Sequence, residues 1–143
     1  MDKKDKKIIE ILMKDGRTKL NKISKEVNLP ITTVFNRLKK LQSEEIIDIS
    51  ANLNRKKLGY DIELYILISI DTSTREVDQE KLAKKLVSMK NILEASIVTG
   101  SKDIVVKATT RNIDEMRNLI LKELRGMTGV ARSESLVIMK EYK

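Results

Sequence analysis

The sequence has no cysteine and no histidine, and only 3% of its residues are aromatic. Without cysteine it can form no disulfide, no thiolate nucleophile and no cysteine-ligated zinc site. Without histidine it lacks the commonest general base and the commonest metal ligand. We therefore expect no metal site, no cofactor and no catalytic residues, and we predict that the protein is not an enzyme.

Long apolar runs are also missing from the chain. No stretch approaches the roughly 20 apolar residues that span a bilayer, and the opening Met-Asp-Lys-Lys does not resemble a signal peptide. These two absences predict a cytoplasmic location and no membrane partner.

Charge is abundant and unevenly distributed. Of the 143 residues, 35% are charged and 41% are hydrophobic, which is typical of a globular chain with one or two small domains. Residues 1–60 hold 15 Lys and Arg against 8 Asp and Glu, whereas residues 61–143 hold 14 against 13. Most of the net charge of +8 therefore lies in the N-terminal part, which favours a polyanionic partner for that part.

The segment Leu29–Leu41 combines an apolar stripe with a cationic face. At helical spacing, one side carries Ile31, Val34, Leu38 and Leu41. The other side carries hydroxyls, an amide and cations without any carboxylate, namely Thr32, Thr33, Asn36, Arg37, Lys39 and Lys40. Asn can pair with adenine edges, Arg or Lys with guanine, and a Thr methyl with thymine, so this helix suits a DNA major groove. The alternative is an ordinary amphipathic helix whose basic face is solvated.

Two shorter helices are expected before this segment. Asp2 can cap the first, with Asp5 in its first turn, and Asp15-Gly16 ends it. Thr18 is the expected cap of the second helix, and Pro30 suits the first turn of the third. The expected buried positions are Ile8, Ile11 and Leu12 in the first helix and Leu20, Ile23 and Val27 in the second. Residues 1–50 therefore read as a helix-turn-helix domain, with an unrelated three-helix bundle as the alternative.

A wing is expected after the third helix. Residues 46–51 read as a short strand and residues 52–54 as a turn, followed by the basic cluster Arg55-Lys56-Lys57. Cations on a wing could meet phosphates, which position a protein on DNA without reading its sequence. The alternative is a solvated linker, and we assign residues 51–61 to a linker between two domains.

Residues 62–143 show a different pattern. Strands are expected at 63–70, 93–99, 103–108 and 130–139, with residues 100–102 as a hairpin turn. One helix begins at Asp78, and a second begins with a capping box of Asn112 and Glu115. The expected buried positions are Leu82, Leu86 and Met89 in the first helix and Ile113, Met116, Ile120 and Leu124 in the second. The order βαββαβ predicts a ferredoxin-like sandwich, so the whole chain is of the α+β class.

The predicted sheet is apolar on both faces, although its two helices can cover only one. The face opposite Leu64, Ile66 and Ile68 is expected to hold Tyr65, Leu67, Val98, Val105 and Val137. Soluble monomers avoid a large exposed apolar patch. We therefore predict a two-fold homodimer that pairs through the sheet.

Over nearly its whole length the chain resembles the Lrp/AsnC (feast/famine) transcription regulators. The matching motifs are Asp2-x-x-Asp5-x-x-Ile8-Ile9, Asp15-Gly16-Arg17, Leu29, Val34-x-x-Arg37-Leu38-Lys39-Lys40-Leu41, Ile46-Ile47, Lys57-Leu58-Gly59-Tyr60, Thr99-Gly100-x-x-Asp103 and Ser133-Glu134-Ser135-Leu136-Val137. Three positions depart from the family pattern: Pro30 replaces a capping Ser, Glu45 a Gly before the wing, and Ser24 a common Ala. The resemblance implies a winged helix-turn-helix domain, a RAM-type effector domain and palindromic DNA sites. It also implies dimers that assemble further into tetramers or octamers and, in many members, an amino-acid effector.

Roles on double-stranded DNA follow from the cationic face. We expect Thr32, Thr33 and Asn36 to reach base edges. Four cations are expected at phosphates, namely Lys19, Arg37, Lys39 and Lys40. For Arg37 the alternative is a structural ion pair with a carboxylate of the first helix.

An amino-acid site is expected at the hairpin, formed by Thr99, Gly100, Ser101, Lys102 and Asp103 with Ser133 and Ser135 of the last strand. Backbone N–H groups around Gly100 could take a carboxylate, and Asp103 could pair with an ammonium. The alternative is that Gly100 is only a turn residue.

The expected function is sequence-specific regulation of transcription, which an amino-acid effector could modulate. One alternative is an architectural protein that coats DNA with little sequence preference, which steep salt dependence and equal affinity for any duplex would mark. Another is a metabolic subunit, but the sequence has no Gly-rich phosphate loop and no nucleophile–base pair to support it.

Overall fold

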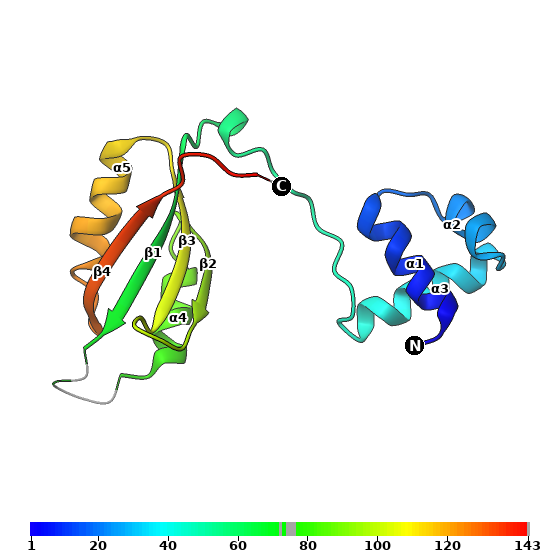
Figure 1. Cartoon of the computed structure of the whole chain (residues 1–143), viewed down its shortest axis with the longest axis horizontal. Coiled ribbons are helices and arrows are strands. Elements are labelled where there is room, and N and C mark those ends of the chain that lie inside the picture. Colours follow the sequence, from blue (N-terminus) through cyan, green and yellow to red (C-terminus); the bar gives the residue numbers. More distant parts are fainter. Residues whose placement is uncertain (72, 74–76, 143) are drawn as a thin grey trace. The chain divides into compact units, whose positions relative to one another are not determined.

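A computed structural model of the chain describes residues 1–71, 73 and 77–142 (Figure 1). Residue 143, the last of the expected C-terminal domain, lies outside the described residues, as do 72 and 74–76. The chain divides into two compact units, Met1–Asn52 and Leu53–Lys143. Within the described ranges, no helix is both long enough and apolar enough to cross a membrane.

The N-terminal unit contains the three expected helices, α1 (Lys3–Lys14), α2 (Leu20–Val27) and α3 (Ile31–Ser43). Its core consists of Ile8, Ile11, Ile23, Val27, Val34 and Leu41, all at most 8% exposed. The expectation for Ile31 was wrong, because this residue lies in the first turn of α3 beyond the reach of α1 and is 49% exposed. Of the predicted apolar stripe of α3, Val34 and Leu41 are therefore buried and Leu38 is half-buried.

The turn between α2 and α3 is held by a side chain. Asn28 ends α2 with φ 51°, a left-handed conformation that Asn tolerates well. The Ser24 hydroxyl donates to the Leu29 carbonyl at 2.6 Å, and the Leu29 N–H donates to the Ser24 carbonyl at 3.1 Å. Ser24, one of the departures from the family pattern, therefore closes the turn that sets the entry of α3.

The cap expected at the start of α2 is not formed. The Thr18 hydroxyl donates to the Asp15 carbonyl at 2.7 Å, and the N-cap position is taken by Lys19, whose side chain cannot accept a hydrogen bond. Thr18 therefore finishes the turn after α1, and α2 begins one residue later than a Thr18 cap requires.

The strand expected at 46–51 is also absent: residues 46–55, all described, contain no strand. Glu45 has φ 55°, and the Ile46 N–H donates to the Leu41 carbonyl at 2.9 Å, which closes the end of α3. A strand needs a partner, and the residues that follow form a 3-10 turn, Lys56–Leu58, that belongs to the other unit. The basic cluster therefore begins the C-terminal unit and lies on no wing hairpin.

The C-terminal unit has the expected βαββαβ order. Its elements are β1 (Ile62–Ile70), α4 (Gln79–Val87), β2 (Ile92–Ile97), β3 (Ile104–Thr110), α5 (Ile113–Asn118), a π-helical continuation (Leu119–Leu124) and β4 (Val130–Val137). The four strands are antiparallel in the order β2-β3-β1-β4, the arrangement of a ferredoxin-like sandwich. Both helices pack on one face of this sheet (Figure 1), where Leu86, Leu119 and Leu124 meet Leu64 and Ile66.

The register corrects one residue of the opposite, uncovered face. Val137 pairs with Leu64 and therefore lies on the helix-covered face, whereas Leu136 pairs with Tyr65 on the open face. Alternation in the sequence shows which residues of a strand share a face, but not which face of the sheet that is. Ser133, Glu134 and Ser135 could lie on either face, so they did not settle the question for β4. The open face nevertheless holds the apolar side chains Tyr65, Leu67, Val105 and Leu136.

The second helix of this unit departs from regular spacing. Ile113, expected in the core, is 67% exposed, while Leu119 and Leu124 are fully buried. The π-helical turn places residues five apart on the same side, so Leu119 takes the position that regular periodicity gives to Ile120. The expected capping box is half formed, because Asn112 accepts from the Glu115 N–H while Glu115 accepts from the Arg111 N–H.

Candidate nucleic-acid interface and ligand site

An ion-paired cluster joins the first turn of α1 to α3. Asp2 and Asp5 form a reciprocal capping box, with backbone-to-carboxylate bonds of 2.8 and 2.9 Å. Arg37 Nη1 lies 2.6 Å from Asp2 Oδ2 and 2.7 Å from Asp5 Oδ1. One guanidinium therefore ties α3 to both carboxylates of the α1 cap.

The pKa values of this cluster are shifted toward the charged forms. The pKa of Asp2 is lowered from its ordinary 3.8 to about 2, first because its carboxylate accepts the Asp5 N–H and next because it accepts from Arg37. The pKa of Asp5 is lowered by the Asp2 N–H and then by Arg37, and that of Arg37 is raised by hydrogen bonds to Asp5 and Asp2. All three groups therefore stay ionised at neutral pH, and the clamp keeps its opposite charges.

The polar residues of α3 fall on two sides of the helix. Thr32, Asn36 and Lys39 are exposed and follow one another at i, i+4 and i+7, so they lie in a row along the helix. We call these three residues, together with Phe35, the outward stripe. Phe35 is 51% exposed and was missed by sequence reasoning, which looked only for polar groups on this face.

The other side of α3 faces an open cleft beside the α1 cap. Thr33, Asn36, Arg37 and Lys40 of α3 line it, and Asp2, Asp5 and Glu44 are among its other lining residues. Lys40 Nζ lies 3.7 Å from Glu44 Oε1, with both side chains well exposed. Of the seven residues expected at DNA, Thr32, Asn36 and Lys39 therefore lie on the outward stripe, while Thr33, Arg37 and Lys40 line the cleft and Asn36 borders it as well. Lys19, the seventh, lies apart from α3 at the N-cap of α2. The ion pair considered as the alternative for Arg37 is the arrangement that the structure contains.

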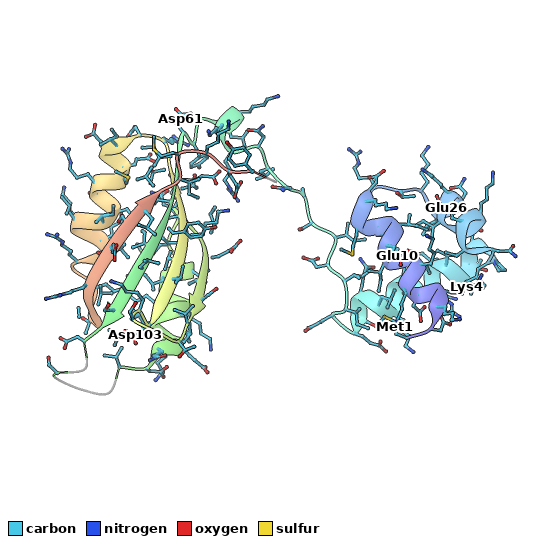
Figure 2. All side chains as sticks on the ribbon, in the orientation of Figure 1. Met1, Lys4, Glu10, Glu26, Asp61 and Asp103 are labelled. Carbon is cyan, nitrogen blue, oxygen red and sulfur yellow. The ribbon has the colours of Figure 1, made fainter. Side chains whose placement is uncertain are left out.

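The hairpin between β2 and β3 is pinned to the end of β1. The Val98 N–H donates to the Asp103 carbonyl, the Asp103 N–H to the Ile68 carbonyl, and the Ile70 N–H to Asp103 Oδ2 at 2.8 Å. Gly100 has φ 135°, a conformation that L side chains rarely adopt. Figure 2 places Asp103 at the opposite end of the sheet from Asp61. Asp103 therefore fixes the hairpin with one carboxylate oxygen.

The other expected ligand residues surround the same end of β1. Ser133 and Ser135 pair with Ile68 and Ile66 and so share the helix-covered face. Lys102 Nζ reaches Glu134 Oε2 at 3.1 Å, which joins the hairpin to β4 on the open face. Thr99, Gly100 and Ser101 are exposed at the hairpin tip. The seven residues thus flank one strand end from both sides and both faces, without converging on one face.

A three-helix unit with an exposed polar and cationic third helix, joined to a ferredoxin-like unit, defines a class of DNA-binding regulators with a separate ligand-binding domain. Residues 1–48 match the winged helix-turn-helix DNA-binding model, and residues 63–143 match the Lrp/AsnC ligand binding domain. The chain belongs to the Lrp/AsnC family of transcriptional regulators, as its motifs indicated. It is a DNA-binding regulator and not an enzyme.

Similar proteins are found among curated regulators and solved structures. The HTH-type transcriptional regulator FL11 of Pyrococcus furiosus is 36% identical over 144 residues, covering 100% of this chain and 92% of that protein. The structure of transcriptional regulator NMB0573 from Neisseria meningitidis in complex with L-Met is 25% identical, with a TM-score of 0.88 over 100% of this chain and 92% of its own. The structure of E. coli AsnC is 25% identical, with a TM-score of 0.85 over 99% and 93%.

Proposed function

We propose that two copies of the chain bind one palindromic duplex site, each presenting the outward stripe of α3 to the major groove. In this arrangement Thr32 and Asn36 contact base edges, while Lys39, Lys40 and Lys19 contact phosphates. Thr33, which lines the cleft, contacts the base edge nearest the α1 cap. We also propose that the protein binds this DNA in the cytoplasm.

Arg37 takes a different part from the phosphate contact expected from sequence. Its guanidinium is held by two carboxylates at 2.6 and 2.7 Å, so a phosphate would have to displace at least one of them. We assign it the role of a positioning residue that fixes the rotation of α3 about its axis. The observation that carries the proposal is that this clamp holds Arg37 of α3 while Thr32, Asn36 and Lys39 of the same helix stay exposed.

The proposed dimer pairs through the open face of the sheet. Leu136 is 47% exposed there and its register partner Tyr65 is 36% exposed, and the neighbouring pair Leu67 and Val105 is half-buried. Lys107 stands over the Tyr65 ring at 5.8 Å, and the Lys102–Glu134 pair borders the patch. Burial of these apolar side chains against a second copy supplies the driving force, and further assembly to tetramers or octamers follows from other surfaces.

The proposed effector is a free amino acid bound at the hairpin end of the sheet. The support is the ligand-binding domain match and the L-Met complex of the Neisseria relative. In our proposal the exposed backbone at Gly100 takes the carboxylate, and the second oxygen of Asp103 takes the ammonium. Calorimetry against each of the twenty amino acids tests this, and an absence of heat across the whole set would refute the effector.

The experiment for DNA function starts with a random duplex library. The wild-type chain is used to select bound duplexes, and the selected sequence is then competed against a shuffled version at several salt concentrations. We expect an inverted repeat and a preference of about 10³-fold or more for the selected site. An architectural coating protein would instead enrich no sequence and bind both duplexes equally.

A further inference from the structure

The recognition helix carries an apolar pair on a surface that is otherwise polar. Phe35, the only phenylalanine of the chain, is 51% exposed, and Ile31, one helical turn earlier, is 49% exposed. Residues four apart on a helix lie side by side, so the two form one small patch. Neither belongs to the apolar cluster that forms the core of this unit.

The position of this patch indicates what it faces. At about 100° per residue, Phe35 lies roughly 60° from Thr32 and 40° from Lys39 around the helix axis. Two side chains of this size make a patch far smaller than a stable protein interface requires. The cation beside it, Lys39, and the positive surplus of the N-terminal part favour a polyanion over a second protein surface.

A DNA major groove offers one apolar feature that such a patch can contact, the 5-methyl group of thymine. We infer that Phe35, supported by Ile31, contacts thymine methyl groups and is a specificity-determining residue of the recognition helix. This inference rests on the proposed function, because it requires that the outward stripe enters the groove. The contact would recognise the methyl group of thymine, which Thr32 and Asn36 cannot recognise by hydrogen bonding.

The test removes the methyl group from the DNA and the ring from the protein. In the selected duplex, each thymine is replaced in turn by deoxyuridine, which lacks only the 5-methyl group. For the wild type we expect one or two positions per half-site at which the substitution weakens binding about 4-fold, the equivalent of one buried methyl group. Phe35→Ala should bind the thymine duplex about 4-fold or more weakly than the wild type does. Replacing thymine by deoxyuridine at those same positions should then weaken the binding of Phe35→Ala no further.

Matched variants separate this contact from a loss of folding. Phe35→Leu keeps apolar bulk and should retain part of the uracil sensitivity. Met13→Ala removes another exposed apolar side chain of the same unit, 83% exposed on α1, and should leave both affinity and uracil sensitivity unchanged. Thermal melting of each variant should lie close to that of the wild type.

The outcomes that overturn the inference differ from those that overturn the proposed function. If the wild type selects no sequence, the proposed function fails. If the wild type selects a site but Phe35→Ala shows the same uracil losses as the wild type, only the inference fails. It also fails if Phe35→Ala lowers the mass of the DNA-free oligomer in light scattering, because the patch would then be a contact between protein surfaces.

Discussion

Arg37 Nη1 lies 2.7 Å from Asp5 Oδ1, across 32 residues of sequence, and the same nitrogen lies 2.6 Å from Asp2 Oδ2. In this pair the Arg37 side chain is 30% exposed and the Asp5 side chain is 15% exposed. Water therefore screens their contact less than it screens an ordinary ion pair on the surface. The N-terminal cap of α1 is thereby coupled to the orientation of α3.

The first prediction concerns pH. The folded pKa of Asp2, about 2, lies below its ordinary value of 3.8, so the unfolded chain binds more protons in this range. The stability that Asp2 contributes should be present above about pH 4 and should be lost as the pH falls from there through about 2. The pKa of Asp5 is also lowered, so its contribution should be lost in the same direction as the pH falls. Carboxyl chemical shifts followed by NMR over this range measure the titration directly.

Arg37→Met separates the two causes of that shift. Because the largest cause is the Asp5 N–H, the pKa of Asp2 should rise in this variant but stay below its ordinary value. Lys7→Met is the matched control, since Lys7 pairs with Glu10 on α1 and lies outside the cluster. An Asp2 pKa that did not move in Arg37→Met would show that the ion pair is absent in solution.

The second prediction concerns the effect of Arg37 on DNA binding. If Arg37 positions α3, Arg37→Met should weaken binding and also blur base preference, while the slope of log affinity against log salt stays near the wild-type value. A phosphate contact would instead reduce that slope by about one and leave base preference intact. Lys40→Ala is the comparison, since it should show the phosphate pattern, and Lys85→Ala on α4 should change neither quantity.

The third prediction uses two adjacent residues on opposite faces of β4. Leu136 and Val137 are 47% and 44% exposed, but only Leu136 lies on the open face. Leu136→Lys should place a charge in the proposed interface and halve the mass found by size-exclusion with light scattering at micromolar concentration. Val137→Lys should leave the mass unchanged. Equal masses for the two variants would contradict pairing through this face.

The fourth prediction concerns the π-helical turn. Leu119 is fully buried whereas Ile113 is 67% exposed. Leu119→Ala should lower the free energy of unfolding by roughly 2–5 kcal/mol, and Ile113→Ala should change it by no more than about 0.5 kcal/mol. Denaturant melts of the two variants measure this difference, and equal losses would mean that the helix keeps regular spacing.

Much of the fold could be predicted because its elements are set by local patterns. Apolar residues three and four apart defined α1, α2 and α3, and the alternation of Leu64, Ile66 and Ile68 defined β1. Asp78 and Asn112 were recognised as caps, and both accept the backbone N–H three residues on. These features depend on neighbours in sequence, which is why reading the chain was sufficient.

The features that could not be predicted depend on distant partners. Residues 46–51 alternate like a strand, but pairing requires a second strand that the chain does not provide there. The wider π-helical turn at Leu119–Leu124 changes which residues of the helix face the sheet. A prediction based on regular α-helical spacing cannot include this change. The face of Val137 was wrong because its phase is fixed only by register with Leu64.

The candidate site was predicted in composition but not in geometry. Each residue of the polar face was identified, yet only the fold shows that Arg37 turns toward Asp2 and Asp5. The same geometry places Thr33 and Lys40 in the cleft, away from Thr32 and Lys39, with Asn36 between the two groups. Phe35 was overlooked because only polar groups were considered as DNA contacts on this face, and the sequence pattern does not show that its ring is exposed.

The most direct measurement compares Asn36→Ala with the wild type on the selected duplex and on every single-base variant of it. Loss of a base-edge contact should cost on the order of 1–3 kcal/mol on the selected site and should abolish discrimination at one base pair of each half-site. Asn118→Ala, an exposed helical amide of the C-terminal unit, should match the wild type throughout. If Asn36→Ala kept both the affinity and the full base preference of the wild type, the outward stripe of α3 would not be the surface that reads DNA.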